Sequence, residues 1–139
     1  MPITVTSPSG VLTGAGRQQI IPRLTRTLVE VSGQKGNEFL TSIIGGTLHE
    51  LEPSNIYAGA ANRPVVMVEL KLPSIGLPDV AARAAFITAA TEIVDDLTVE
   101  EHDRTNTWVN IVNAPDGGWG IGGTAYTGED LIVAISESS

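Results

Sequence analysis

The chain has 139 residues, of which 42% are hydrophobic and 17% are charged, and its formal net charge is −8. This length suits one domain, or two fused half-domains that share one core. The acidic balance argues against nucleic acid as a partner, since nucleic-acid-binding domains carry basic stripes. The absence of cysteine excludes disulfides and thiolate chemistry. The sequence contains no apolar run long enough to suggest a membrane span and no basic leader typical of a signal peptide. A cytoplasmic location is therefore expected.

The first half of the chain reads as strand, helix, strand and hairpin. An apolar strand, PITVT, opens at Pro2, and a second apolar run, TSIIGGTL, covers 41–48. Between them, GRQQIIPRLTRTLVEVSG predicts a helix. Pro22 lies inside this pattern and should kink the helix or delay its start. Tyr57 then leads into the small residues AGA. The apolar stripe of the helix consists of Ile20, Ile21, Leu24, Leu28 and Val31.

The second half repeats this order. Pro64 opens the strand PVVMVELKL, TWVNIVN forms the second strand, and Trp119 leads into GIGG. Pro78 and Asp79 are typical of a helix start, and a helix is predicted over 78–96. An offset of 62 positions is expected to relate the halves throughout: Pro2 and Pro53 are 51 apart, as are Pro64 and Pro115. The predicted stripe of the second helix consists of Val80, Ala84, Ile87, Thr91 and Val94.

The repeat predicts an α+β fold. A single domain is expected over 1–139, with a first half at 2–61, a second half at 64–123 and a tail at 124–139. Each strand–helix–strand unit forms a parallel pair with a right-handed crossover, and two such halves can bury each other's apolar faces. If a twofold relates the halves, their first strands run antiparallel. Lys71, at the end of the second half's first strand, should then approach Pro2.

The sequence GWGIGG at 118–123 matches the dinucleotide-binding pattern G-x-G-x-x-G. That motif requires a following helix and an acidic residue about 20 positions further on, but only 16 residues follow Gly123. We therefore interpret these glycines as a hairpin turn. His49–Glu50 and the EEHD run at 100–103 are too sparse to specify a metal site. No metal and no cofactor are predicted.

The doubled unit, its opening Met-Pro and the run WVNIVNAPDGGWGIGG together resemble the tautomerase superfamily, in particular the 4-oxalocrotonate tautomerase subunit. The whole chain resembles the fused, double-length members of the cis-3-chloroacrylic acid dehalogenase and malonate semialdehyde decarboxylase groups. The resemblance covers residues 2 to about 130. It implies a homotrimer in which the hairpins and the tail LIVAI seal subunit contacts. The preceding TGED could instead cap a short C-terminal helix.

The resemblance implies that Pro2 is the catalytic residue. Methionine aminopeptidase removes Met1 before a small residue, which would leave Pro2 with a free secondary amine. An α-amino group has a pKa of about 8 in water, and burial or a nearby cation lowers it, so the amine could act as a general base near neutral pH. The alternative is that Pro2 merely begins a strand. The nitrogen of Pro64 is an amide, so one working site per chain is expected.

Four further positions are candidate substrate-binding residues by resemblance. Lys71 and Ser74 fall where related groups carry two arginines, and Lys71 would hold a carboxylate as a point charge; it could equally be a solvated strand end. Asn110 falls where the dehalogenases have a tyrosine. Trp119 falls at an aromatic wall of the site, or else packs in the core or at the trimer interface. Arg17, Arg63 and Arg104 are the fallback cations.

The sequence therefore predicts a cofactor-independent tautomerase, an isomerase acting on a small anionic enol or 2-keto carboxylic acid. One alternative is a decarboxylase or hydratase of a small 3-carbon acid, in which Pro2 would be cationic. Another is a catalytically silent trimeric binding or scaffold protein of the same fold. Hydrolytic dehalogenation is not expected, since the acidic residue that the dehalogenases carry in the last hairpin is absent.

Overall fold

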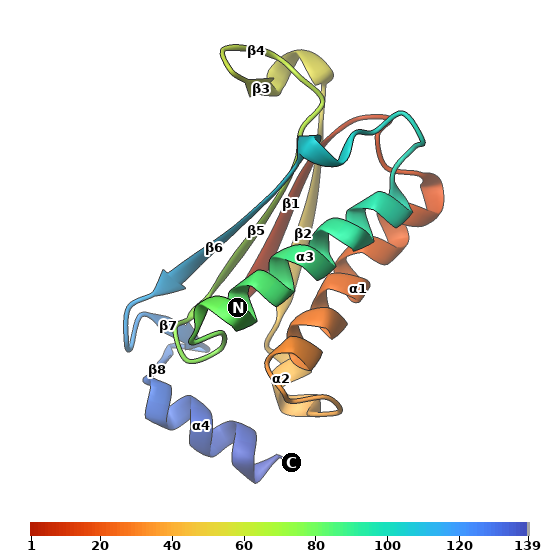
Figure 1. The fold of residues 1–139 in the computed structure, drawn as a ribbon. Coiled ribbons are helices and arrows are strands. Elements are labelled where there is room, and N and C mark those ends of the chain that lie inside the picture. Colours follow the sequence, from red (N-terminus) through yellow and green to blue (C-terminus); the bar gives the residue numbers. More distant parts are fainter. Residues whose placement is uncertain (139) are drawn as a thin grey trace.

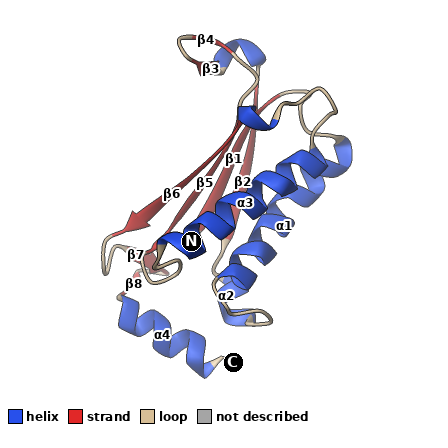
Figure 2. Cartoon of the chain, viewed as in Figure 1, coloured by secondary structure: helices blue, strands red, loops and turns tan. Residues whose placement is uncertain are grey.

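The computed structural model describes residues 1–138. Its centre is a four-stranded sheet in the order β2-β1-β5-β6. Two long helices, α1 (Gly14–Val31) and α3 (Val80–Leu97), lie side by side across one face of this sheet, as Figure 1 shows. Among residues 1–138, no helix or strand covers the opposite face (Figure 2). The strands are β1 (Pro2–Pro8), β2 (Gly45–Leu51), β5 (Val66–Pro73) and β6 (Thr107–Ala114).

The strand pairing confirms the α+β fold with two strand–helix–strand halves. Strand β1 is parallel to β2, and β5 is parallel to β6. The two first strands, β1 and β5, are antiparallel, with a register that runs from the pair Ile3–Leu70 to the pair Thr6–Met67. The halves therefore meet through their first strands at the centre of one sheet.

The side chains of the strands alternate between the two faces, as the period of two requires. Ile3, Val5, Val68 and Leu70 are fully buried beneath the helices. Thr4 pairs with Glu69 and Glu69 with Asn110, so these three residues form a row across the open face. The open face also exposes Leu51, Trp108 and Val112.

Helix α1 begins well before Pro22, the proline that was expected to kink the helix or delay its start. The Thr13 side chain accepts a hydrogen bond from the Gly16 amide at 2.9 Å and caps the helix, which runs through Pro22. Pro22 therefore does not delay the helix start. Ile20, Leu24 and Leu28 of the predicted stripe are buried. Thus the periodicity in this segment identified the core face correctly.

The predicted stripe of α3 was largely wrong, although its start at the Asp79 cap is confirmed. Val80 is 74% exposed and Ile87 is 39% exposed. The segment is rich in alanine and apolar on several sides, so periodicity alone could not select a face. The buried face of α3 is instead the one that carries Phe86, because this large side chain needs the most room in the core. The residues of α3 that are buried are Phe86, Ala90, Ile93, Val94 and Leu97.

The repeat offset of 62 holds for the second strands but not throughout. Gly45 and Thr107, which open β2 and β6, are 62 positions apart, whereas Gly14 and Val80, which open the helices, are 66 apart. The connections differ because the first half contains an extra short helix, α2 (Glu38–Ser42). The predicted apolar run 41–48 is accordingly divided between the end of α2 and the start of β2.

Both halves end in a hairpin. Strands β7 (Trp119–Ile121) and β8 (Thr124–Tyr126) are joined by Gly122 and Gly123, whose φ angles are 60° and 87°. These angles confirm the turn interpretation of GWGIGG, since a two-residue type I′ turn needs positive φ at both central positions. The first-half hairpin joins β3 (Tyr57–Ala58) to β4 (Ala61–Asn62). Short 3-10 helices, η1 (Pro53–Asn55) and η2 (Arg104–Asn106), precede β3 and β6.

The C-terminal segment forms helix α4 (Gly128–Glu137). Thr127 and Asp130 form a reciprocal capping box, so of the two interpretations of TGED the helix cap is the one observed. Leu131 is 1% exposed and packs into the core of its own chain, whereas Ile132 and Val133 of the same tail are exposed, and the subunit contact that the resemblance implied stays a prediction. Within residues 1–138, no helix has the length and apolarity to cross a membrane.

Candidate functional site at the N-terminus

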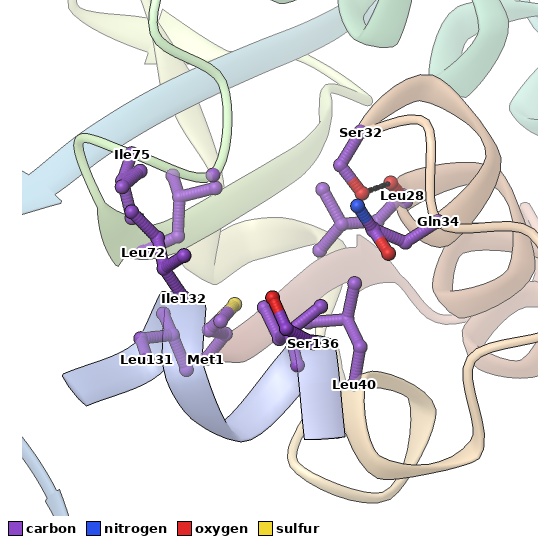
Figure 3. Close-up of a pocket in the computed structure, with 12 residues that line it drawn as sticks. Met1, Leu28, Ser32, Gln34, Leu40, Leu72, Ile75, Leu131, Ile132 and Ser136 are labelled. Atoms are coloured by element: carbon purple, nitrogen blue, oxygen red, sulfur yellow. Dashed lines mark hydrogen bonds between the residues drawn. The ribbon is translucent and has the colours of Figure 1, made fainter. Parts of the chain in front are cut away.

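A cavity of about 170 Å³ lies beside the start of β1. Figure 3 shows its walls, which come from the end of α1, from α2, from the end of β5 and from α4. Helix α4 closes the side away from the sheet. The lining residues are Met1, Leu28, Ser32, Gln34, Leu40, Leu72, Ile75, Gly76, Leu131, Ile132, Ile135 and Ser136.

The lining of this cavity is mainly apolar and contains no charged side chain among the described residues. Its polar side chains, Ser32, Gln34 and Ser136, are all neutral. The hydroxyl of Ser32 donates to the carbonyls of Leu28 and Val29 within α1. A ligand in this space would therefore contact mostly leucine and isoleucine side chains.

Met1 fills one side of the cavity and is only 5% exposed. Its amino group donates a hydrogen bond to the Ile43 carbonyl at 2.9 Å, and its own carbonyl accepts one from the Gly45 amide at 3.2 Å. Burial lowers the pKa of this amine from 8.0 to about 6. The Met1 amine is thus largely neutral at pH 7.

Pro2 is the first residue of β1, and its ring is exposed on the open face of the sheet. Ile3 pairs with Leu70 in the antiparallel register, so the next residue of β5, Lys71, lies across from Pro2. The Lys71 ammonium is 3.2 Å from the Glu69 carboxylate and is about half exposed. The structure thus places these two predicted site residues at adjacent strand ends.

The other predicted residues lie elsewhere. Ser74 lines a separate, open depression with Asp116 and Glu129, near the start of α4. Asn110 is exposed in the middle of the open face. The half-buried Trp119 packs against the core, and its ring centroid is 5.1 Å from that of Tyr126. None of these residues lines the cavity at Met1, and their roles stay predictions.

The fallback cations are engaged far from the N-terminus. Arg17 forms an ion pair with Glu50, and Arg104 forms one with Asp95. Arg63 donates to Asn106 and its guanidinium lies 5.9 Å from the centroid of the Trp108 ring. Within the described part of the chain, no cluster of three or more His, Asp or Glu side chains could hold a metal ion.

Sequence reasoning missed the residues that build the cavity. Leu28 was recognised as part of a helical stripe, but its place at the end of α1 makes it a cavity wall. Leu40 lies on the unpredicted helix α2. The signal that could have found Leu131 was the TGED cap, since a helix beginning there carries an apolar face.

Comparison with known proteins gives a match at the level of structure only. No family model matches the chain, and no curated protein sequence matches it. The native fused 4-OT structure superposes with a TM-score of 0.73 at 21% identity, covering 96% of this chain and 99% of that one. A fused 4-OT symmetric trimer gives a TM-score of 0.75 at 16% identity, covering 94% and 98%.

A malonate semialdehyde decarboxylase inhibited by 3-bromopropiolate also matches, with a TM-score of 0.68 at 18% identity, covering 96% of this chain and 95% of that one. The matched proteins span nearly the whole chain, so the likeness includes both halves and the hairpins. At these identities it establishes the fold. The chain therefore has the tautomerase fold, in the double-length form of fused 4-OT.

Proposed function

We propose that the protein belongs to the tautomerase superfamily and is a cofactor-independent tautomerase of enol or 2-keto carboxylic acids. In this proposal Met1 is removed and the secondary amine of Pro2 is the general base. The observation that carries the proposal is the environment of the N-terminus. The Met1 amine is desolvated beside an apolar cavity, and burial lowers its pKa to about 6. The Pro2 nitrogen is bonded to the Met1 carbonyl carbon and would open onto the same cavity when Met1 is removed. A neutral amine is what base catalysis near pH 7 requires.

The reaction needs one proton carrier. Neutral Pro2 takes the proton from the hydroxyl at carbon 2 of the enol, and the C2–O bond becomes a carbonyl. The electron pair of the C2=C3 double bond then takes the same proton from the Pro2 ammonium at carbon 3. The product is the 2-keto acid and the amine is again neutral. Lys71, across from Pro2, would stabilise the substrate carboxylate and the developing enolate charge.

The open face of the sheet supports a proposed homotrimer. No helix or strand within residues 1–138 covers it (Figure 2). It exposes the side chains of Leu51, Trp108 and Val112. Large apolar side chains exposed on an uncovered sheet face are typical of an interface. One matched protein is described as a symmetric trimer. We propose that three copies bury part of this face against one another and leave the end at Pro2 and Lys71 accessible to substrate.

The decarboxylase or hydratase alternative is less well supported. It would need Pro2 to remain cationic, whereas burial at the preceding residue already lowers the pKa of the Met1 amine and so favours a neutral N-terminus. It would also draw on a pair of cations, and of the two predicted positions only Lys71 is basic. The tautomerase proposal requires neither feature.

The test is the ketonisation of phenylenolpyruvate, followed by ultraviolet absorbance. Intact mass first establishes that Met1 is absent from each protein. We expect the Pro2→Ala variant to lose about 10²-fold or more in kcat/KM, the typical contribution of a general base. Pro64→Ala is the matched control, because Pro64 is an exposed proline whose nitrogen is an amide. It should retain the wild-type rate.

Two outcomes contradict the proposal. Background rates in both wild type and Pro2→Ala would leave a tautomerase fold that serves a different purpose, such as binding. A wild-type rate that survives in Pro2→Ala would move the base to another residue. Equal losses in Pro2→Ala and Pro64→Ala would indicate damage to the fold instead of loss of a base.

A further inference from the structure

We infer that the substrate is a monocarboxylic enol acid whose uncharged end, an alkyl or aryl group, enters the cavity under α4, and that α4 sets this specificity. The inference rests on the proposed function and adds the substrate class. It predicts discrimination against dicarboxylic enol acids of the same length.

The composition of the cavity favours an uncharged group. Leu28, Leu40, Leu72 and Leu131 contribute its walls, and none of the lining side chains is charged. Placing a carboxylate among such side chains without a cation removes its hydration and is strongly unfavourable. An apolar group placed there gains the free energy of leaving water.

The alternation of side chains along β5 separates the cation from the cavity. Consecutive residues of a strand point to opposite faces. Lys71 is exposed on the open face, whereas Leu72, the next residue, is 1% exposed and lines the cavity. The cation and the apolar space therefore lie on opposite sides of the β1 start, where the Pro2 nitrogen is. In the inferred arrangement, a substrate that reaches the Pro2 nitrogen with its acid end at Lys71 would have its other end at the cavity.

The cavity is also large enough for an apolar group. The cavity measures about 170 Å³ while the Met1 side chain occupies one side of it. An apolar cavity of about 150 Å³ accommodates benzene. Removal of Met1 enlarges the space directly beside the Pro2 nitrogen, because that nitrogen is bonded to the Met1 carbonyl carbon. The space is therefore large enough for a phenyl ring or a branched alkyl chain.

The experiment uses two enols that differ only at the far end. One is 2-hydroxyhexa-2,4-dienoate, which ends in a methyl group, and the other is 2-hydroxyhexa-2,4-dienedioate, which ends in a carboxylate. Both are followed by ultraviolet absorbance with the Met1-free protein. We expect kcat/KM to be at least about tenfold higher for the methyl-ended acid, since desolvating a carboxylate costs more than the 1.4 kcal/mol that corresponds to a factor of ten.

A charge added to α4 tests the role of the helix. Ile132 lines the cavity and is 48% exposed, whereas its neighbour Val133 is 53% exposed and is not among the lining residues. Ile132→Arg should reduce the preference for the methyl-ended acid by about tenfold or more, because the guanidinium can pair with the distal carboxylate. Val133→Arg adds the same charge to the same helix and should keep the wild-type preference.

Each possible outcome either supports or overturns the inference. A preference for the methyl-ended acid that Ile132→Arg lowers and Val133→Arg does not supports the inference. Equal rates or a preference for the diacid in the wild-type protein overturns the inference while the proposed function stands. Equal effects of both arginine variants overturn the role of α4. If neither these acids nor phenylenolpyruvate is ketonised, the proposed function fails and the inference fails with it.

Discussion

The side chain of Asn37 connects α2 to α4 by donating a hydrogen bond from Nδ2 to the Ile135 carbonyl, 3.0 Å away. Its Oδ1 meanwhile accepts from the Leu40 amide at 2.8 Å and caps α2. Asn37 is 4% exposed. The buried side-chain amide of Asn37 thus forms hydrogen bonds with a backbone amide at the start of α2 and a backbone carbonyl near the end of α4. These bonds hold α4 against the cavity.

Asn37→Asp should separate these two roles. A carboxylate can still cap α2, but it cannot donate to Ile135, and it would face that carbonyl oxygen in a buried position. We expect the free energy of unfolding to fall by about 1–3 kcal/mol, the cost of an unsatisfied buried polar group, measured by urea denaturation. Faster proteolysis within 128–138 should accompany it. Unchanged stability and protease resistance would show that the contact does not hold α4.

Gly16 should not tolerate a side chain. A Cβ at this position would meet the backbone carbonyl oxygen of Leu97, where the start of α1 touches the end of α3. Gly16→Ala would gain helix propensity, but the clash with backbone should outweigh it and lower the free energy of unfolding by about 1–3 kcal/mol. Gly14→Ala is the control, since a Cβ there meets nothing within 4 Å. A thermal melt in which both variants match wild type would contradict this packing.

The first-half hairpin offers a stabilising change. Ala60 has φ of 64°, a left-handed conformation that is costly for residues with a Cβ. Ala60→Gly should raise the free energy of unfolding by up to about 1 kcal/mol. Gly59→Ala, at φ of 63° in open space, should lower it by about 1 kcal/mol. Chemical denaturation of both variants tests the pair, and shifts of the same sign would argue against this turn.

Retention of Met1 should make stability depend on pH. A large residue at position 2, as in Pro2→Leu, blocks removal of Met1. The pKa of its amine falls from 8.0 to about 6 on folding because of burial. At a pH between these two pKa values, the Met1 amine is protonated more fully in the unfolded chain than in the folded one. The free energy of unfolding should therefore rise as the pH increases from about 6 to about 8. Acetylation of the Met1 amine should abolish this pH dependence of the free energy of unfolding, measured by urea titration. A pH dependence that persists after acetylation would have to come from another titratable group.

Lys71 should affect substrate binding more than turnover. As the cation across from Pro2, it would hold the carboxylate in both ground state and transition state. Lys71→Ala should therefore raise the KM for phenylenolpyruvate by about tenfold with a smaller change in kcat. Lys35→Ala is the control, because Lys35 is 83% exposed. An unchanged KM would make Lys71 a solvated strand end.

The sequence was sufficient for the architecture of the sheet and the hairpins. Alternating Ile3 and Val5, the stripe of Ile20 and Leu24, and the paired glycines Gly122 and Gly123 are local signals whose period or φ requirement specifies the element. The twofold then followed from the repeat, and with it the antiparallel contact between β1 and β5. For the candidate site, the sequence could point to Pro2 and Lys71 because their relation depends only on strand order.

The cavity and the core face of α3 depended on tertiary packing. Val80 and Phe86 are both apolar, and only the space between α1 and the sheet decides which of them is buried. Likewise, Leu40 and Leu131 are far apart in the chain, and they meet because α2 and α4 both pack at the start of β1. The sequence by itself determined the elements, since these follow from local periodicity. The tertiary structure decided the site, because a cavity is formed by side chains that no local pattern brings together.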